Sequence, residues 1–226
     1  MLSAIVLAAG KGKRFISKVP KVISSLGGKP VIWYSLATLN RHPEVNEIIV
    51  VTSLKNKKRI AEIIRKYNIN KAGKIILGGE KRQDSVLSGL RAISRDADYV
   101  LIHDGARPFI DGNMVSRLCF AAKKTGASIA AVKVKNTIKE ARKQVVVKTL
   151  RRDNLWEVQT PQVFRKGIIL KAYARMGNLE VTDDATLVER MGVAVGIAPG
   201  SYSNIKITTP EDLITAGMIL KKIRLI

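Results

Sequence analysis

The hydrophobic pattern of the chain alternates between short apolar runs and longer segments in which apolar residues recur every three or four positions. The short runs have the length of buried strands and are residues 2–7, 47–52, 74–77, 99–103 and 128–134. Between them lie segments with helical spacing: Pro30 to about Asn40, the stretch with Ile60, Ile63, Ile64 and Tyr67, the stretch with Val86, Leu87, Leu90 and Ile93, and Asp111 to about Lys124. This alternation predicts an α/β fold with a mostly parallel sheet covered by helices on both faces.

Several boundaries follow from local signals. Gly27-Gly28 is a turn, Asp84 or Ser85 is expected to cap the third helix, and Asp111 the fourth. In the last third we expect helices near 166–176, at about 183–191 and from Pro210 to the end, and strands at 193–198 and 204–207. There is no internal repeat or linker, so the sequence predicts one domain over residues 1–226.

The alternation breaks between residues 136 and 154, where the chain is polar and basic with one apolar run at 145–147. This segment predicts a β-hairpin that projects from the domain and has too little apolar surface to fold alone. Such an arm usually needs a partner, so we expect a homodimer formed through residues 136–154. The alternative is a surface hairpin without a partner.

Composition narrows the class of protein. A chain of 226 residues with 46% hydrophobic content suits a globular domain. No apolar stretch reaches the length of a membrane span and no charged leader precedes the first apolar run, so we expect a cytoplasmic protein without membrane contact. The single cysteine, Cys119, excludes an internal disulfide and lies on an apolar helical stripe, which favours core packing.

The formal net charge of +22 indicates an anionic partner, either nucleic acid or a polyphosphate, unless it only reflects a lysine-rich or thermophilic source. The basic residues are spread along the chain, and aromatic residues make up only 5%. Because single-strand binding surfaces interleave bases with aromatic side chains, specific nucleic-acid binding is not expected.

The loop after the first strand, Ala8-Ala9-Gly10-Lys11-Gly12-Lys13-Arg14, is the strongest candidate for chemistry. Its glycines and small side chains allow backbone N–H groups to approach a polyanion, while its basic residues and the later Lys21 add positive charge. It matches neither the Walker A loop nor the dinucleotide fingerprint, since Phe15 stands in place of the third glycine. A plain strand exit with solvated lysines is the alternative.

Two further loops also follow predicted strands. Residues 78–85 form a glycine turn that opens a helix and offers the Ser85 hydroxyl, although a helix cap would explain Asp84 equally well. Residues 103–108 hold Asp104 and Arg107, which can bind hydroxyls and an anion or simply pair with each other. We interpret His103 as a packed histidine. Ligands of parallel sheets bind beyond the carboxyl ends of strands, where these loops meet.

Taken in order, these loops resemble one family over nearly the whole chain. With Val19-Pro20-Lys21, Leu155-Trp156, Thr160-Pro161-Gln162, Thr182-Asp183-Asp184-Ala185 and the segments 204–208 and 210–213, they resemble the 2-C-methyl-D-erythritol 4-phosphate cytidylyltransferases of isoprenoid synthesis. The resemblance implies a Rossmann-like fold and transfer of a cytidylyl group from CTP to a phosphorylated sugar alcohol, with pyrophosphate released. It also implies Mg²⁺ carried by the CTP phosphates, because no carboxylate or histidine cluster has the spacing of a dedicated metal site.

The resemblance assigns roles residue by residue. Arg14 and Lys21 would stabilise the transferring phosphate. The nucleotide would be bound by Ala8, Ala9, Gly10, Gly12, Gly79, Glu80, Ser85 and Asp104. The sugar-alcohol phosphate would be bound by Asp104, Arg107, Thr137, Arg152, Thr160, Thr182 and Lys206, with Thr137 and Arg152 contributed across the dimer.

Two positions depart from the family pattern. Gly105 replaces an alanine or serine that is common in this loop, and Ser203 stands where some members carry an aspartate, so no carboxylate at this position orients Lys206. Two rival functions remain open at this stage. Ribitol-5-phosphate cytidylyltransferases share the loops but tend to have cysteine where Ala185 stands. A nucleotide-binding regulator would need no chemistry, yet it would have no use for both Arg14 and Lys21.

Overall fold

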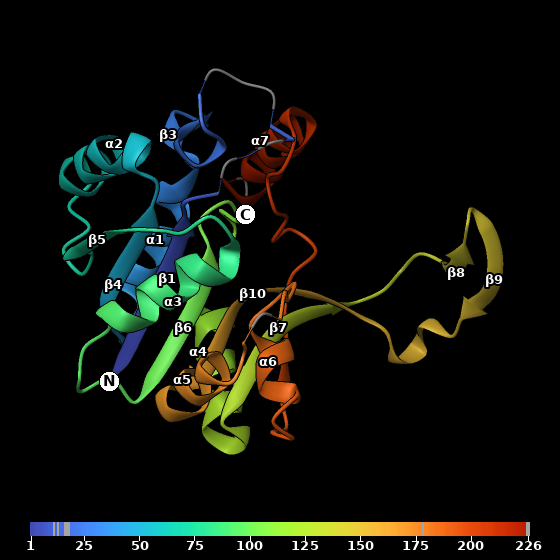
Figure 1. Cartoon of the computed structure of the whole chain (residues 1–226). Helices are drawn as coiled ribbons and strands as arrows, with labels where there is room; N and C mark the ends of the chain where they lie inside the picture. The colour runs from blue at the N-terminus through green and yellow to red at the C-terminus, as the bar shows by residue number, and fades with distance from the viewer. Residues whose placement is uncertain (11, 13, 16–18, 178, 225–226) are drawn as a thin grey trace.

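A computed structural model of the chain describes residues 1–10, 12, 14–15, 19–177 and 179–224. Over these residues a seven-stranded sheet has the order β11-β7-β10-β6-β1-β4-β5 (Figure 1). Its strands are β1 (Leu2–Ala8), β4 (Val45–Thr52), β5 (Lys74–Leu77), β6 (Tyr99–Asp104), β7 (Ala127–Lys133), β10 (Trp156–Arg165) and β11 (Gly196–Pro199). Only β10 runs antiparallel to its described neighbours, so the predicted, mostly parallel sheet is confirmed.

Helices cover both faces of this sheet, as the sequence predicts. On one face lie α1 (Val31–Arg41), α2 (Leu54–Lys66) and α4 (Gly112–Thr125), whose buried residues share one apolar core. On the other face lie α3 (Arg82–Ala92), α5 (Lys166–Ala174) and α6 (Ala185–Glu189) around a second core. The central strand β1 contributes side chains to both cores, because Ala4 and Val6 belong to the first and Ile5 to the second.

A third, smaller cluster joins the glycine-rich loop to the last helix, α7 (Pro210–Arg224). Phe15 is buried there against Leu220 and Ala216 of α7. The chain between Lys21 and Pro30 holds the short helix η1 (Lys21–Ile23) and the strand pair β2 (Ser25–Leu26) and β3 (Lys29–Pro30), joined by the predicted Gly27-Gly28 turn. Phe15, where the dinucleotide fingerprint has a glycine, therefore anchors the loop.

The predicted arm is present as a hairpin of β8 (Ile138–Arg142) and β9 (Val145–Leu150), followed by the short helix η2 (Arg152–Asn154). Figure 1 shows it extending away from the rest of the molecule. Lys143 and Gln144 form the two-residue turn with φ of 45° and 65°, as a type I′ hairpin requires. Val145, Val146 and Val147 are exposed.

The structure differs from the prediction at three places, and the prediction also lacks the antiparallel strand of the main sheet. Residues 204–207 are not a strand but a loop, and the Ile207 N–H donates to the Ala106 carbonyl in the turn after β6. Helix α3 begins at Arg82 with Lys81 at the N-cap, and Asp84 accepts from the Lys81 N–H within the first turn. The last strand, β11, begins at Gly196 rather than at 193.

The missing strand is β10, whose polar residues and Pro161 resemble a loop in sequence. Its glutamines are buried because they have partners: Gln159 hydrogen-bonds to Ser201 and Asn204, and Gln162 to Asp183. Asp111 does cap α4, accepting from the Met114 N–H, and Cys119 is packed in the core as predicted. None of the described helices is both long and apolar enough to span a membrane.

Candidate active site

A pocket of about 630 Å³ opens where β1, β5 and β6 end. We call it the central pocket; it is lined by Leu7, Ala8, Ala9, Gly10, Lys21, Val22, Gly79, Glu80, Lys81, Arg82, Ser85, Asp104, Ala106 and Lys206. It therefore brings together the residues predicted to bind the nucleotide, except Gly12, which lines an adjoining hollow. Lys11 and Lys13 of the same loop lie outside the described residues.

The glycines at the end of β5 allow this pocket to form. A β-carbon on Gly78 would lie 2.5 Å from the Ala9 Cβ and from the Ser85 Oγ, and one on Gly79 would lie 2.3 Å from the Asp84 Cβ. These contacts are too short for a side chain, so both positions need glycine. The close approach holds Ala9 of the first loop against the start of α3.

Gly105, where the family often has alanine or serine, is also closely packed. A β-carbon there would lie 3.0 Å from the Leu7 carbonyl oxygen and 3.3 Å from Ile32 and Val6. Alanine at this position would therefore force its neighbours to shift by a few tenths of an ångström. Glycine lets β6 and the end of β1 approach more closely here.

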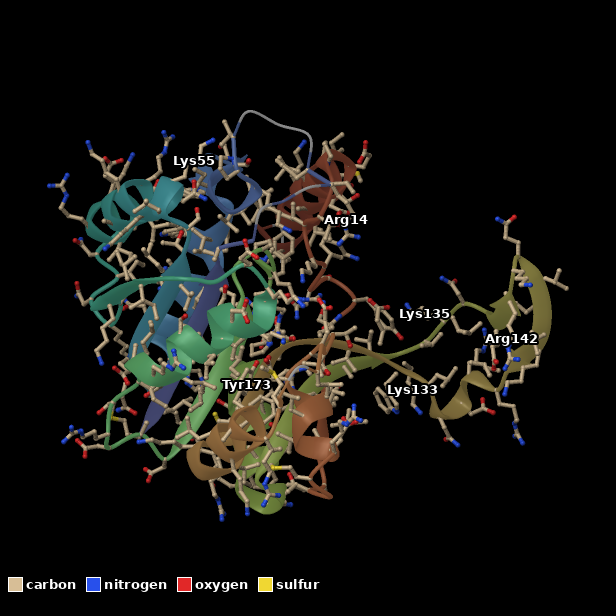
Figure 2. All side chains as sticks on the ribbon, viewed as in Figure 1. Arg14, Lys55, Lys133, Lys135, Arg142 and Tyr173 are labelled. Carbon is tan, nitrogen blue, oxygen red and sulfur yellow. The ribbon has the colours of Figure 1, made fainter. Side chains whose placement is uncertain are left out.

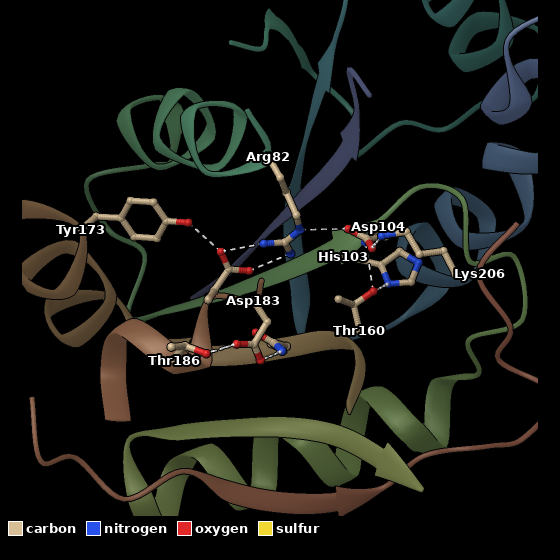
Figure 3. Close-up of polar contacts among 10 residues, drawn as sticks. Arg82, His103, Asp104, Thr160, Tyr173, Asp183, Thr186 and Lys206 are labelled. Carbon is tan, nitrogen blue, oxygen red and sulfur yellow. Dashed lines mark hydrogen bonds and ion pairs between the residues drawn. The ribbon is translucent and has the colours of Figure 1, made fainter. Parts of the chain in front are cut away.

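Asp104 is the centre of the charge network in the pocket (Figure 3). It is buried at the end of β6, where Arg82 Nε contacts its Oδ1 at 3.3 Å and Lys206 Nζ its Oδ2 at 2.6 Å. Burial alone would raise the pKa of Asp104, but Arg82 and Lys206 hold it well below its usual range. Asp104 is therefore ionised, and it orients Lys206 without a carboxylate at position 203.

Arg82 was not among the predicted site residues, yet it links Asp104 to a second carboxylate. Its guanidinium donates two hydrogen bonds to Asp184, at 3.0 and 2.8 Å, and Asp184 is fully buried and also accepts from Tyr173 at 2.6 Å (Figure 3). Burial disfavours the charge of Arg82, but Asp184 and Asp104 outweigh it and raise its pKa. Only the polar sequence around Arg82 and the Asp183-Asp184 pair hinted at this contact.

His103 is a packed histidine, as the sequence analysis interprets it. Its Nε2 lies 3.0 Å from the Arg107 carbonyl oxygen, which can only accept, so Nε2 carries the proton. Its Nδ1 then accepts from the Thr160 hydroxyl at 3.1 Å, while the same hydroxyl oxygen accepts from the Asp104 N–H at 3.0 Å. Burial lowers the pKa of His103 to about 4, so the ring is neutral and has no free nitrogen to act as a base.

A second hollow, the β10 hollow, adjoins the central pocket on the β10 side and shares Arg82, Asp104 and Lys206 with it. It is also lined by Arg107, Val158, Gln159, Thr160, Gln162, Thr182, Asp183, Thr186 and Glu189. Arg107 donates to the Asn204 carbonyl at 2.7 Å, and its buried Nε has no partner among the described residues. The hollow therefore gathers the substrate-binding residues predicted outside the arm: Asp104, Arg107, Thr160, Thr182 and Lys206.

Arg14 and Lys21 lie on the loop side of the pocket. Lys21 is half-buried, and its pKa is lowered by burial first and then by the charge of Lys206, with a smaller contribution from Arg14. Arg14 is exposed and lies beside α7 (Figure 2), held by the neighbouring Phe15. The three cations Arg14, Lys21 and Lys206 thus act on the same region, which disfavours a further positive charge and favours a polyanion.

Thr137 and Arg152 are not brought to this pocket within one chain. Both are exposed on the arm, and Arg152 donates to the Lys135 carbonyl at 2.5 Å. The described residues also contain no group of three acidic, histidine or cysteine side chains that could hold a metal ion. The ionised Asp104 in the pocket already has both oxygens on Arg82 and Lys206.

Comparison with known proteins places this chain in one enzyme class. A family model described as 2-C-methyl-D-erythritol 4-phosphate cytidylyltransferase matches residues 2–222. A protein of that name from Dehalococcoides mccartyi is 47% identical over 222 residues, covering 98% of this chain and 96% of the relative. One from Clostridium botulinum is 44% identical over 224 residues, covering 98% of both chains.

A solved structure supports the same enzyme class. That of 4-diphosphocytidyl-2C-methyl-D-erythritol synthase from Anaerococcus prevotii superposes with a TM-score of 0.86 at 35% identity, covering 97% of this chain and 98% of that one. The fold is shared with this synthase, and the class of protein is a nucleotidyltransferase. The chain belongs to the 2-C-methyl-D-erythritol 4-phosphate cytidylyltransferase family.

Proposed function

We propose that this chain transfers the cytidylyl group of CTP to 2-C-methyl-D-erythritol 4-phosphate, forming 4-diphosphocytidyl-2-C-methyl-D-erythritol and pyrophosphate. The observation that carries the proposal is the joining of two hollows by one charge network. Asp104, Arg82 and Lys206 line both the central pocket and the β10 hollow, so a nucleotide in one and a phosphorylated polyol in the other would meet over them. Membership of the family supports the identity of both substrates.

The cytosine would lie against Ala8, Ala9, Gly79 and Ser85, where glycine and alanine leave backbone groups accessible. Asp104 is ionised and can accept hydrogen bonds from ribose or polyol hydroxyls. In the β10 hollow, Arg107 and Thr182 would contact the polyol phosphate. Thr160, whose hydroxyl is already engaged by Asp104 and His103, would shape the wall rather than donate to substrate.

The chemical step needs charge neutralisation more than proton transfer. A phosphate oxygen of the acceptor attacks the α-phosphorus of CTP, and the bond to the bridging oxygen of the pyrophosphate breaks. The acceptor phosphate is already ionised at neutral pH, so no base is required, and His103 is neutral and engaged. Lys21, Lys206 and Arg14 would offset the charge that builds up on the phosphate oxygens in the transition state.

Mg²⁺ would enter with the CTP phosphates. The Asp104 oxygens are occupied by cations, and the described residues offer no other carboxylate cluster in the pocket. Since Mg²⁺ commonly keeps water ligands and binds substrate phosphates, this donor set fits a metal held mainly by the nucleotide. When bound, it would add positive charge to the triphosphate.

The arm would complete the site in a homodimer. Val145, Val146 and Val147 expose apolar surface on a hairpin that extends away from the rest of its own chain. We propose that residues 136–154 reach the partner subunit, where Thr137 and Arg152 would bind the polyol phosphate. The single domain of residues 1–226, with this arm as its dimerisation element, and a cytoplasmic location belong to the same proposal.

Pyrophosphate release tests the function directly. The full chain with CTP and Mg²⁺ should release pyrophosphate with 2-C-methyl-D-erythritol 4-phosphate and not with ribitol 5-phosphate. Release with ribitol 5-phosphate alone would overturn the substrate assignment. CTP binding without release from either acceptor would indicate a nucleotide-binding regulator instead.

A further inference from the structure

Two buried titratable side chains of the charge network, Asp184 and Tyr173, have no contact with the proposed substrates. Asp184 is fully buried and Tyr173 is 5% exposed. Neither side chain lines the central pocket or the β10 hollow. A buried carboxylate paired with arginine often stabilises a fold no more than apolar side chains of the same volume would. Stability alone is therefore a weak reason for a carboxylate at position 184.

The contacts of Arg82 show which of its two carboxylates fixes the guanidinium. Its two terminal nitrogens lie 3.0 and 2.8 Å from the two Asp184 oxygens, whereas Asp104 receives only the Nε contact at 3.3 Å. A bidentate pair fixes the plane of a guanidinium as well as its position. A side chain that served only to neutralise Asp104 would be expected to direct both terminal nitrogens at Asp104. Arg82 is therefore anchored on Asp184 and contacts Asp104 from that fixed position.

Tyr173 fixes Asp184 in turn. Its hydroxyl donates to Asp184 Oδ1 at 2.6 Å (Figure 3). Burial and then the charge of Asp184 raise the pKa of Tyr173, so the hydroxyl keeps its proton and remains a donor. Among the described residues, Arg82 and Tyr173 supply every hydrogen bond to the Asp184 carboxylate. Tyr173 of α5 is thereby connected to Arg82 at the start of α3.

This arrangement leaves one oxygen of Asp104 to Lys206. Arg82 Nε contacts Oδ1 of Asp104, and Lys206 Nζ lies 2.6 Å from Oδ2. If Asp184 did not hold the two terminal nitrogens of Arg82, they could turn to Asp104 and compete with Lys206 for Oδ2. The Lys206 side chain is 36% exposed, so it has room to move away. The position of Lys206 therefore depends on where Arg82 is held.

We propose that Asp184 and Tyr173 are positioning residues for the cytidylyl transfer, because they hold Arg82 in place. This inference rests on the proposed function. Asp184 acts through Arg82, and Tyr173 acts through Asp184. Lys206 lines both hollows and would offset charge on the reacting phosphates, so its displacement costs transition-state stabilisation. A displacement of about 1 Å at a reacting centre can cost ~10²-fold in rate.

Asp184→Asn tests the proposal with a side chain of nearly the same shape. Asparagine offers one acceptor oxygen where aspartate offers two, so the two-point anchoring of Arg82 is lost. We expect kcat for pyrophosphate release to fall ~10–100-fold while KM for both substrates stays unchanged, the pattern of an interaction made only in the transition state. Tyr173→Phe removes only the hydroxyl and should show the same split with a fall of about three- to tenfold, the equivalent of one hydrogen bond. Unchanged kcat in Asp184→Asn would overturn the proposal.

Ser128→Ala is the matched control for lost stability. The Ser128 hydroxyl is buried and donates to the Leu118 carbonyl at 2.8 Å, and Ser128 lines neither the central pocket nor the β10 hollow. This variant should unfold at a lower temperature and keep the wild-type kcat. If it loses turnover as Asp184→Asn does, at a similar loss in unfolding temperature, general loosening of the fold explains both results and the proposal is wrong.

A double-mutant cycle tests whether Asp184 acts through Arg82. Adding Asp184→Asn to Arg82→Met should lower kcat no further than Arg82→Met alone, because the side chain that Asp184 holds is already gone. Losses that multiply would mean that Asp184 affects the reaction by another route, contrary to the proposal.

A crystal structure of Asp184→Asn gives a readout that does not depend on turnover. The terminal nitrogens of Arg82 should lie on Asp104, with Lys206 Nζ beyond hydrogen-bonding distance of Oδ2. An unmoved Arg82 overturns the inference even if the wild-type chain forms the expected product. A wild-type chain that forms no product from either acceptor overturns the proposed function, and the position of Arg82 in the variant still decides whether Asp184 holds it.

Discussion

The charge network around Asp104 and the arm of residues 136–154 are both rich in charged side chains, but they hold their charges in opposite ways. In the network Asp104 and Asp184 are buried, and each is contacted by a cation. On the arm the pair between Lys148 and Glu140 is exposed, and three valines have no cover. The network is complete within one chain, whereas the arm leaves its valines exposed within one chain.

The largest loss of stability should come from removing Asp184, the fully buried carboxylate of the network. Asp184→Ala removes the carboxylate that Arg82 and Tyr173 contact. Among the described residues it leaves Asp104 as the one carboxylate in contact with the largely buried Arg82 guanidinium. We expect a loss of about 3–5 kcal/mol in the free energy of unfolding, measured with urea. The double variant Asp184→Leu with Arg82→Met should regain stability but not activity. Equal recovery of both would show that Arg82 has no part in positioning Asp104.

The next effect concerns turnover rather than stability. Lys21→Ala removes a cation that faces the proposed position of the reacting phosphate, and we expect kcat to fall ~10²–10³-fold. Since Lys21 is half-buried beside other cations, its removal should leave the unfolding temperature unchanged or higher. Steady-state kinetics and thermal unfolding of the same preparation check both points. A fall in stability with normal kcat would make Lys21 a structural residue.

His103 should give the network a histidine-linked pH dependence, whereas the arm has no histidine. Its folded pKa of about 4 lies below the ordinary 6.5, so between these values the unfolded chain binds a proton that the folded chain does not. Stability is therefore lost as pH falls from 6.5 to 4, by about 3 kcal/mol. His103→Asn should show a shallower loss over this range in urea unfolding. An unchanged slope would mean that His103 does not remain neutral.

The arm can be tested by mixing two impaired variants and measuring activity at an acceptor concentration below KM, where both variants are slow. If Arg152 acts across a dimer, Lys21→Ala and Arg152→Ala chains form mixed dimers in which one of the two sites is intact. Random exchange then restores about a quarter of wild-type activity. Arg152→Ala alone should raise KM for the acceptor ~10–100-fold, as loss of a charged phosphate contact would.

A control mixture shows whether recovery of activity requires residues from two different chains. Mixing Lys21→Ala with Arg107→Ala leaves no intact site, because both residues line hollows of the same chain. This mixture should therefore stay inactive. Recovery here, or none with Arg152→Ala, would place Arg152 outside a shared site.

The sequence revealed the arm and the three pocket loops for the same reason: local pattern determines them. The arm breaks the strand and helix alternation, and the loops follow apolar strands. The link from Arg82 to Asp184 has no local signal, because the two residues are 102 positions apart and pair only when α3 and α6 cover the same face of the sheet. Strand β10 was missed because Gln159 and Gln162 look exposed in sequence and are buried only through tertiary partners.

The smallest effect should come from the arm's own ion pair, and it completes the comparison with Asp184. Glu140→Gln removes the carboxylate that lies 3.1 Å from Lys148 Nζ, in a pair whose side chains are 38% and 60% exposed. Water screens these charges and both side chains lose freedom when they pair, so we expect a change below about 0.5 kcal/mol in the free energy of unfolding. Urea unfolding beside Asp184→Ala would measure it. A loss near that of Asp184→Ala would mean that Glu140 is buried in the protein as it exists in solution, and the surface that buries it would then have to come from a second copy of the chain.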